Sequence, residues 1–304
     1  MSELTGRHVW IDGVLQPADG HHLSAFDRGF QLGDGVFETL RARAGRPTEL
    51  AEHLDRLRRS ATGLDIALGS SLEADLTRGI KQLLVAEGLD GPDGDASVRI
   101  TVSRGVATGR GLLPAGPTEP TIVIQAWPVP SPPAGHLERG LHLVSSAVRR
   151  DPASPLAALK TTSRAEYVYA RLEARRAGAD DALFLTIDGR ISEATSANVF
   201  LVRSAEGGTE LATPALDCAI LPGTTRTWIL GWAHAAGLHP IEGSLVPADL
   251  AAADEAFLCS SVAGILPVTM FDGTPIGTGR PGPWTARARK AREAFIRGES
   301  QGKT

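Results

Sequence analysis

The chain has 304 residues, of which 42% are hydrophobic and 22% charged, so it is long enough for two domains with sizeable cores. Its 31 Lys and Arg residues face 35 Asp and Glu residues, and a net charge of −4 lacks the basic field of nucleic-acid-binding proteins. No apolar run approaches the ~20 residues of a membrane-spanning helix, no apolar signal region begins the chain, and two cysteines are too few for a disulfide framework or a cysteine metal site. These features favour a cytoplasmic protein that binds no nucleic acid, membrane or metal ion.

The first part of the chain predicts short strands and two amphipathic helices. Asp12-Gly13 tolerates the positive φ angles of a tight turn, which favours a hairpin around it. Between residues 50 and 64, leucines and an alanine recur at alternating spacings of four and three, which is typical of a helix with one apolar stripe. Arg56 lies beside this stripe, either as a solvated helix charge or as an anion ligand at the edge of a buried site. The predicted hairpin, strand and two helices cover residues 9–15, 36–42, 50–64 and 72–86.

Two further strands, at 97–103 and 120–126, flank a loop at 104–111 that carries arginines. Residues 127–135 contain four prolines in nine positions, and this composition predicts a stiff, extended linker between domains. We therefore expect a small N-terminal domain over 1–126, a linker at 127–135, a larger C-terminal domain over 136–298 and a tail at 299–304.

The second half predicts a β-rich domain with flanking helices. Predicted strands and hairpins cover 141–148, 182–187, 190–194, 198–202, 255–259 and 268–276, and predicted helices begin at Ala165, after Gly223 and at Trp284. The strands at 182–202 look like successive antiparallel neighbours. The expected fold class is α+β, mixed α/β, in two domains.

Lys160 stands out because only four of the 31 Lys and Arg residues are lysines. Arg fills most positions that need a cation, so a retained lysine favours chemistry that guanidinium cannot perform. A primary amine can condense with a carbonyl group, and its pKa falls readily on burial. The alternative is a lysine at a strand end whose amine reaches solvent.

Two polar turns have the composition of anion sites. Thr224 and Thr225 follow Pro222-Gly223 at a predicted helix start, where backbone N–H groups, hydroxyls and the helix dipole can bind an anion. A plain N-cap is the alternative. Ser260-Ser261 forms a second such turn. With Lys160, the carboxylate of Glu193 and the helical Arg56, these turns supply what pyridoxal 5′-phosphate (PLP) needs: an amine for its aldehyde, an acid for its ring nitrogen and donors for its phosphate.

Five motifs in order between Val9 and Trp284 resemble those of class IV, or fold-type IV, PLP enzymes. This family includes branched-chain and D-amino-acid aminotransferases, (R)-selective amine transaminases and 4-amino-4-deoxychorismate lyase. The motifs are His53-Leu54-Asp55-Arg56-Leu57, the Lys160 segment, Ser192-Glu193 with Asn198-Val199-Phe200, Leu221-Pro222-Gly223-Thr224-Thr225-Arg226, and Ser260-Ser261 with Ile265-Leu266-Pro267-Val268.

The resemblance implies a role for each motif. Lys160 is expected to form a Schiff base with PLP and to move a proton as general acid and base, and Glu193 is expected to pair with the pyridine nitrogen. Leu221 is expected to pack on the ring. The expected phosphate ligands are Arg56, Thr224, Thr225 and Ser261. The resemblance also implies a homodimer with the cofactor between the two domains and a partner loop, here Gly105 to Leu113, closing the site.

Substrate choice is harder to infer, because the chain departs from each subgroup. The loop reads Thr108-Gly109-Arg110-Gly111 and lacks the histidine of D-amino-acid aminotransferases, and Ala165 stands where branched-chain enzymes carry a tyrosine. Arg28, Arg110 and Arg164 are the candidate carboxylate ligands, with surface or interface ion pairs as the alternative. Phe37 and Val262 complete the predicted substrate site.

We therefore predict a PLP-dependent aminotransferase that moves an amino group from an amino acid, with D-amino acids preferred, or from an (R)-primary amine to a 2-oxo acid. Three alternatives stay open. They are 4-amino-4-deoxychorismate lyase, a branched-chain L-amino-acid aminotransferase, and a non-catalytic binding protein in which Lys160 is structural.

Overall fold

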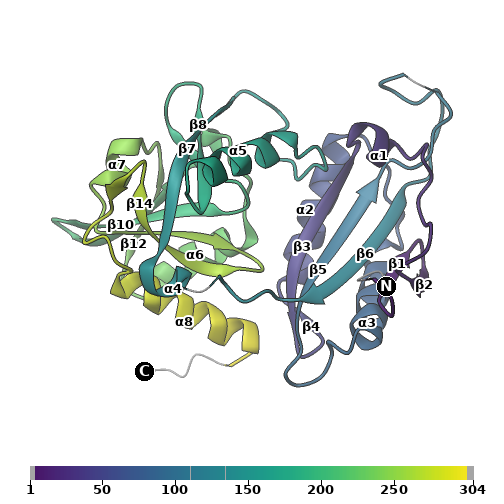
Figure 1. The fold of residues 1–304 in the computed structure, drawn as a ribbon, viewed down its shortest axis with the longest axis horizontal. Coiled ribbons are helices and arrows are strands. Elements are labelled where there is room, and N and C mark those ends of the chain that lie inside the picture. The colour runs from purple at the N-terminus through teal and green to yellow at the C-terminus, as the bar shows by residue number, and fades with distance from the viewer. Residues whose placement is uncertain (1–3, 110, 134, 300–304) are drawn as a thin grey trace. The chain divides into compact units, whose positions relative to one another are not determined.

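The chain folds into two compact units, each of which is described by itself. The computed structural model describes residues 4–109, 111–133 and 135–299 (Figure 1). Unit 1 consists of Met1–Val129 and Leu159–Arg164, and unit 2 of Pro130–Ala158 and Ala165–Thr304. Strand β6 of unit 1 runs to Pro128, inside the predicted linker. Across the described part of the chain, no helix is long and apolar enough to cross a bilayer.

Unit 1 is an antiparallel sheet of six strands in the order β2-β1-β6-β5-β3-β4. Its strands are β1 (His8–Ile11), β2 (Val14–Pro17), β3 (Gly35–Arg43), β4 (Arg46–Pro47), β5 (Asp95–Ser103) and β6 (Thr121–Pro128). Its helices are α1 (Arg28–Leu32), α2 (Leu50–Gly63) and α3 (Leu72–Ala86). The predicted hairpin at 9–15 is confirmed, and Asp12 and Gly13 take φ angles of 45° and 96°.

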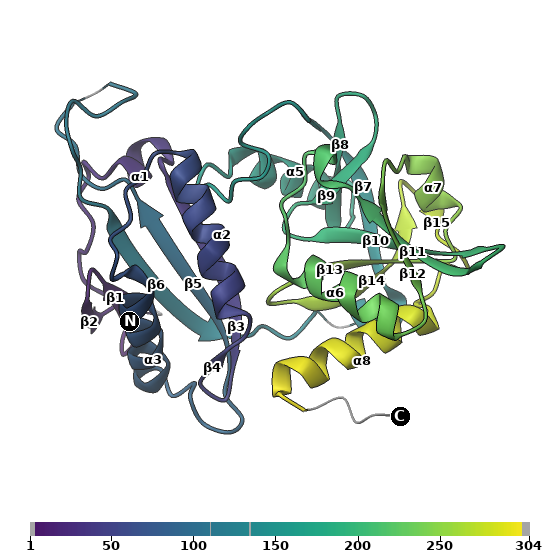
Figure 2. The same ribbon diagram turned by 180° about the vertical axis from the view of Figure 1, so that it is seen from behind.

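Helices α2 and α3 cover one face of this sheet, as Figure 2 shows. Side chains alternate across a strand, so Val36 and Leu40 of β3 and Ile100 of β5 point into the core beneath the helices. Gly79 of α3 allows close packing, because a Cβ there would lie 2.7 Å from the ring of Trp10. Alternate residues, Phe37 and Arg99 among them, therefore belong to the other face.

The segment Leu159–Arg164 belongs to unit 1 because it pairs with one edge of β3. Strand β4 pairs only with Ala42 and Arg43, so it leaves the first half of this edge without a neighbouring strand. Val36 and Thr161 form an isolated bridge there, the Phe37 amide donates to the Lys160 carbonyl at 2.9 Å, and the Thr162 amide donates to the Gly35 carbonyl at 2.9 Å.

Unit 2 is built on a mixed sheet of nine strands in the order β12-β11-β10-β13-β14-β7-β8-β9, with β15 paired to β14. The strands are β7 (Leu141–Arg150), β8 (Asp181–Thr186), β9 (Ile191–Ala194), β10 (Asn198–Ala205), β11 (Gly208–Pro214), β12 (His239–Gly243), β13 (Glu255–Ser260), β14 (Gly264–Phe271) and β15 (Thr274–Pro275). The helices are α4 (His136–Arg139), α5 (Ala165–Arg176), the 3₁₀ helix η1 (Leu216–Cys218), α6 (Thr224–Ala235), α7 (Pro247–Ala251) and α8 (Pro283–Arg297).

Helices α6 and α8 pack on the sheet around the stacked rings of Phe200 and Phe257, and α5 packs on β7 and β8 through Ala170 and Ala174. The prediction of three successive antiparallel strands at 182–202 is only partly right. β8 and β9 are antiparallel, but β10 pairs with β11 and β13 elsewhere in the sheet. Local patterns indicated the strands, whereas their partners depend on contacts distant in sequence.

Candidate active site

Lys160 is held through its backbone on unit 1. Its amide donates to Ser60 Oγ of α2 at 3.0 Å, and its carbonyl accepts from Phe37 of β3. Its Nζ lies 4.7 Å from the centroid of the Phe37 ring. Two elements thus fix the backbone on both sides of this residue, and the amine lies over an aromatic ring, where a cation is attracted by the π electrons.

Two arginines join Lys160 at the Phe37 ring. The guanidinium carbon of Arg99 lies 3.9 Å from the ring centroid and that of Arg164 lies 5.7 Å from it. Burial, and then the charge of Arg164, lowers the pKa of Arg99 below its ordinary value. Arg99 and Arg164 repel one another, and an anion bound by both would relieve that repulsion. The arrangement can therefore bind a carboxylate.

Arg99 was not predicted from the sequence as a site residue. It reaches Phe37 because β5 pairs with β3 in a register that sets Arg99 opposite Thr39, two residues along from Phe37 on the same face. The sequence does carry one signal, a charged residue alternating with the buried Val98 and Ile100. That signal indicates the outer face of a strand, but the neighbouring strand is set by the fold.

Arg56 lies on α2 and is buried beside two other polar groups, Glu38 of β3 and His53 of α2. Its Nε and Nη2 donate to the two carboxylate oxygens of Glu38 at 2.8 Å and 2.7 Å. The predicted phosphate ligand is therefore held rigidly by a carboxylate. Neither Glu38 nor His53 was predicted as a site residue.

Arg28 is 2% exposed, and its hydrogen bonds join α1 to the loop after β5. Its guanidinium donates to Asp34 at 2.8 Å, to the Gly111 carbonyl at 3.0 Å and to the Leu112 carbonyl. Burial raises the pKa of Asp34, but hydrogen bonds from Arg104 and Arg28 outweigh burial and lower it. These contacts hold the loop to α1. The role of Arg28 as a carboxylate ligand stays a prediction, as does that of Arg110, which lies outside the described residues.

Glu193 is the centre of a hydrogen-bonded group on unit 2. It lies on β9 with 5% of its surface exposed, and its Oε2 accepts the Leu221 amide at 2.9 Å and Asn198 Nδ2 at 3.3 Å. Arg150 Nη2 lies 3.9 Å from the other oxygen, Oε1. A buried carboxylate oriented by these donors can accept a cationic N–H.

The two anion turns of unit 2 meet. Thr224 begins α6, and its hydroxyl lies 3.2 Å from the hydroxyl of Ser261, in the turn between β13 and β14. The N-cap residue, Gly223, offers no side-chain acceptor to the first N–H groups of the helix. Thr225 is buried, and its hydroxyl accepts from Arg292 Nη2 at 3.2 Å. Val262 follows Ser261 and is half-buried.

The predicted site residues thus fall into two groups. Phe37, Lys160 and Arg164 come together on unit 1, where Arg56 and Arg28 lie in separate polar clusters. Glu193 and Leu221 come together on unit 2, as do Thr224 and Ser261.

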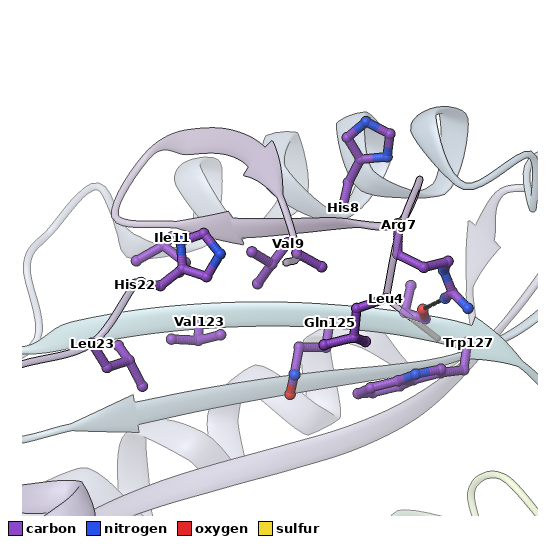
Figure 3. A pocket seen from close by; sticks show the side chains of 12 residues that line it. Leu4, Arg7, His8, Val9, Ile11, His22, Leu23, Val123, Gln125 and Trp127 are labelled. Atoms are coloured by element: carbon purple, nitrogen blue, oxygen red, sulfur yellow. Dashed lines mark hydrogen bonds between the residues drawn. The ribbon is translucent and has the colours of Figure 1, made fainter. Parts of the chain in front are cut away.

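A pocket of about 290 Å³ lies on unit 1 beside β1 and β6. Figure 3 shows Val9 and Ile11 of β1 and Val123 of β6 along it, with Leu23 at one end and Trp127 at the other. Of the predicted site residues that the structure describes, none lines this pocket.

Comparisons with known proteins agree on one family. The sequence profile described as amino-transferase class IV matches residues 35–271. The chain is 32% identical to the D-alanine aminotransferase of Bacillus licheniformis, over 96% of this chain and 98% of that protein. It is similar to the branched-chain amino acid aminotransferase structure of Escherichia coli, with 27% identity, a TM-score of 0.89 and coverage of 98% and 97%. It also resembles the 4-amino-4-deoxychorismate lyase structure of Pseudomonas aeruginosa, with 32% identity, a TM-score of 0.77 and coverage of 93% and 97%.

Proposed function

Because the chain belongs to the class IV aminotransferase family, whose enzymes depend on PLP, we propose that it transfers an amino group from a D-amino acid or an (R)-primary amine to a 2-oxo acid. The observation that carries the acid part of this proposal is the group of cations at Phe37. Amino and 2-oxo acids present a carboxylate next to the reacting carbon, and Arg99 and Arg164 are cations that can receive it at the same Phe37 ring that the amine of Lys160 contacts.

The donors and acceptors of the described residues fit PLP. A pyridinium N–H needs a carboxylate acceptor, and Glu193 is a buried carboxylate oriented by Leu221 and Asn198. A phosphate needs several N–H and O–H donors, which the hydroxyls of Thr224 and Ser261 and the start of α6 supply. When bound, PLP supplies a conjugated electron sink for the electrons of the substrate's Cα–H bond.

We assign the residues of both units to roles on this basis. Lys160 Nζ would hold the cofactor, and as a free amine it would move the proton released from the substrate's Cα. Glu193 keeps the ring nitrogen protonated. Arg56, Thr224, Thr225 and Ser261 bind the phosphate, and Leu221 packs on the ring.

We assign the substrate carboxylate to Arg99 and Arg164. Phe37 and Val262 border the substrate, and Arg28 and Arg110 are kept as further candidates for its carboxylate. A D-amino donor is supported by the 32% identity to a D-alanine aminotransferase. The arginine-bearing loop resembles those of the lyase and of (R)-selective amine transaminases more than that of branched-chain enzymes.

Two other reactions are second candidates. Elimination of pyruvate from 4-amino-4-deoxychorismate is favoured by 32% identity to a lyase of known structure. Transfer from L-branched-chain amino acids is favoured by the TM-score of 0.89 to a branched-chain enzyme. Both reactions would use the same cofactor-binding residues, so they have to be distinguished by which substrate the protein converts.

A turnover assay separates these reactions. The PLP-loaded protein is incubated with 2-oxoglutarate or pyruvate and one donor at a time: D-alanine, D-glutamate, L-leucine or (R)-1-phenylethylamine. Chiral chromatography of the amino acid product is expected to reveal turnover with D-amino acids or the (R)-amine. Turnover confined to L-leucine would support the branched-chain reaction, and release of 4-aminobenzoate and pyruvate from 4-amino-4-deoxychorismate without amino transfer would support the lyase.

We further propose that the protein is a cytoplasmic homodimer in which a loop from the partner, Gly105 to Leu113, closes the site. Leu112 and Leu113 in this loop are 82% and 80% exposed in the single chain, which fits a surface that a partner covers. Analytical ultracentrifugation of the PLP-loaded protein tests the dimer, and a monomer at micromolar concentration would refute it.

A further inference from the structure

Glu38 and His53 form a buried polar cluster on unit 1 with Arg56, the proposed phosphate ligand. Glu38 lies on β3, and His53 and Arg56 lie one turn apart on α2. Their exposed fractions are 0%, 0% and 4%. Burying three polar side chains costs desolvation free energy unless they form hydrogen bonds or ion pairs with one another. The contacts within this cluster therefore indicate its role.

Glu38 forms a bidentate ion pair with one edge of the Arg56 guanidinium. Its Oε1 accepts from Nε at 2.8 Å and its Oε2 accepts from Nη2 at 2.7 Å. Two parallel bonds to a planar group fix both its position and its plane. Nη1 lies on the other side of the guanidinium carbon, so the direction in which it points is set by Glu38.

His53 fixes Glu38 in turn. His53 Nδ1 lies 2.7 Å from Glu38 Oε2, and a carboxylate can only accept, so Nδ1 carries the proton and donates it. The 3.4 Å separation between Arg56 Nη2 and His53 Nδ1 is then an approach of two donors and not a hydrogen bond. Burial raises the pKa of Glu38, but the bonds and charges of Arg56 and His53 outweigh burial and lower it to about 2. Glu38 is therefore an anion throughout the neutral pH range.

We propose that Glu38 is a positioning residue, which, held by His53, orients the Arg56 guanidinium to bind the phosphate of PLP. This inference rests on the proposed function, because that function assigns Arg56 to the phosphate. A freely rotating arginine on α2 would lose side-chain entropy when it bound the phosphate, whereas the pair with Glu38 has already restricted it.

A merely structural role predicts a different result. If Glu38 only joined β3 to α2, its loss would disturb all of unit 1, including the nearby Lys160 segment. PLP and pyridoxal, which lacks the phosphate, would then lose affinity alike. If Glu38 acts through Arg56, its replacement weakens only the binding of the phosphate. The affinity for PLP then falls, and the affinity for pyridoxal does not.

The experiment measures the dissociation constants of PLP and pyridoxal for the cofactor-free full chain, by absorbance titration, in the wild type and in Glu38→Gln. Glu38→Asp keeps the charge but draws the carboxylate back by one methylene, and it serves as the second variant if Glu38→Gln does not fold. Asp95→Asn is the matched control. Asp95 accepts from Nε and Nη2 of Arg41 at 2.7 Å and 2.6 Å, so it makes the same kind of pair with the same strand but touches no predicted site residue.

The ratio of the dissociation constant of pyridoxal to that of PLP is expected to fall at least about tenfold in Glu38→Gln. PLP binds more weakly in this variant because a charge-assisted hydrogen bond to its phosphate is misdirected. A smaller fall is expected in Glu38→Asp and none in Asp95→Asn. An unchanged ratio in folded Glu38 variants, or a wild-type ratio near one, would overturn the inference. The proposed function fails separately, if the wild type binds PLP but transfers no amino group.

Discussion

Replacing Glu38 with Gln is expected to destabilise unit 1 by about 3 kcal/mol at pH 7 and by less in acid. The pKa of Glu38 falls from its ordinary value of 4.5 to about 2 on folding, which corresponds to roughly 3 kcal/mol of stabilisation. Breaking a buried ion pair by removing one partner costs about 3 to 5 kcal/mol, because the remaining charge is left buried. The two estimates agree in size.

The sign of the pH dependence follows from the lowered pKa. A carboxylate whose pKa is lowered by folding stabilises the native state above the unfolded pKa, and this stabilisation is lost as the pH falls from about 4.5 towards 2. Wild-type protein therefore loses about 1 kcal/mol of this contribution by pH 4. Gln does not titrate, so the difference in the free energy of unfolding between wild type and Glu38→Gln should narrow by that amount between pH 6 and pH 4.

Urea unfolding of cofactor-free protein, followed by circular dichroism at pH 7, 6, 5 and 4, measures this difference. Carboxylates that titrate in both proteins cancel in the comparison. The control Asp95→Asn removes a pair whose carboxylate side chain is 25% exposed, so it should cost at most about 1 kcal/mol. A loss of stability below about 1 kcal/mol for Glu38→Gln at pH 7, or a stability difference that does not narrow in acid, would show that the ionised Glu38 does not stabilise the fold.

Three further predictions concern the substrate carboxylate, the pairing of Glu193 with the cofactor ring, and the loop at residues 111–113. Arg99→Gln should raise the KM for the 2-oxo acid at least about tenfold with a smaller change in kcat, since a charged hydrogen bond is lost, and an unchanged KM would count against the role of Arg99. Gly223→Ala should weaken PLP binding in a titration, because a Cβ there would lie 2.1 Å from Asn198 Oδ1 and displace it. Gly231→Ala on the same helix meets nothing within 4 Å and should stabilise the protein by up to about 1 kcal/mol, so equal effects of the two alanines would contradict this account. Asp34→Asn should speed hydrogen exchange at residues 111–113, because it weakens the contacts that hold this loop, and unchanged exchange would show that they do not hold it.

The elements with strong local signals were predicted well from the sequence. The helix at 72–86 was confirmed to the residue, since its apolar stripe is regular, and the first hairpin was confirmed because Asp12-Gly13 suits its turn. The elements α1, α4, α7, β4, β11 and β12 were not predicted. All but the seven-residue β11 span two to five residues, which is too short for any periodicity to appear.

The candidate site could be predicted where a residue type is rare in the chain or where a motif resembles that of a known family. Lys160 was noticed because lysines are few, and Glu193 because its motif resembles a known family. Arg99 and Glu38 contact partners on other elements, Phe37 and Arg56, and the strand register and helix packing that join them are set by the fold. A cation that ties a loop, as Arg28 does, uses the same chemistry as a cation that binds a ligand, and no local pattern distinguishes the two.

We propose above all that this chain transfers amino groups through a cofactor attached to Lys160. The most direct test is a single-turnover experiment without any 2-oxo acid, in which the PLP-loaded protein is mixed with D-alanine or D-glutamate. We expect one equivalent of pyridoxamine 5′-phosphate and one of 2-oxo acid per site from the wild type. We expect no product from Lys160→Ala and full yield from Lys81→Ala, which changes an exposed lysine of α3. Wild-type protein that holds PLP yet forms no pyridoxamine 5′-phosphate with any D- or L-amino acid or (R)-amine would rule out amino transfer.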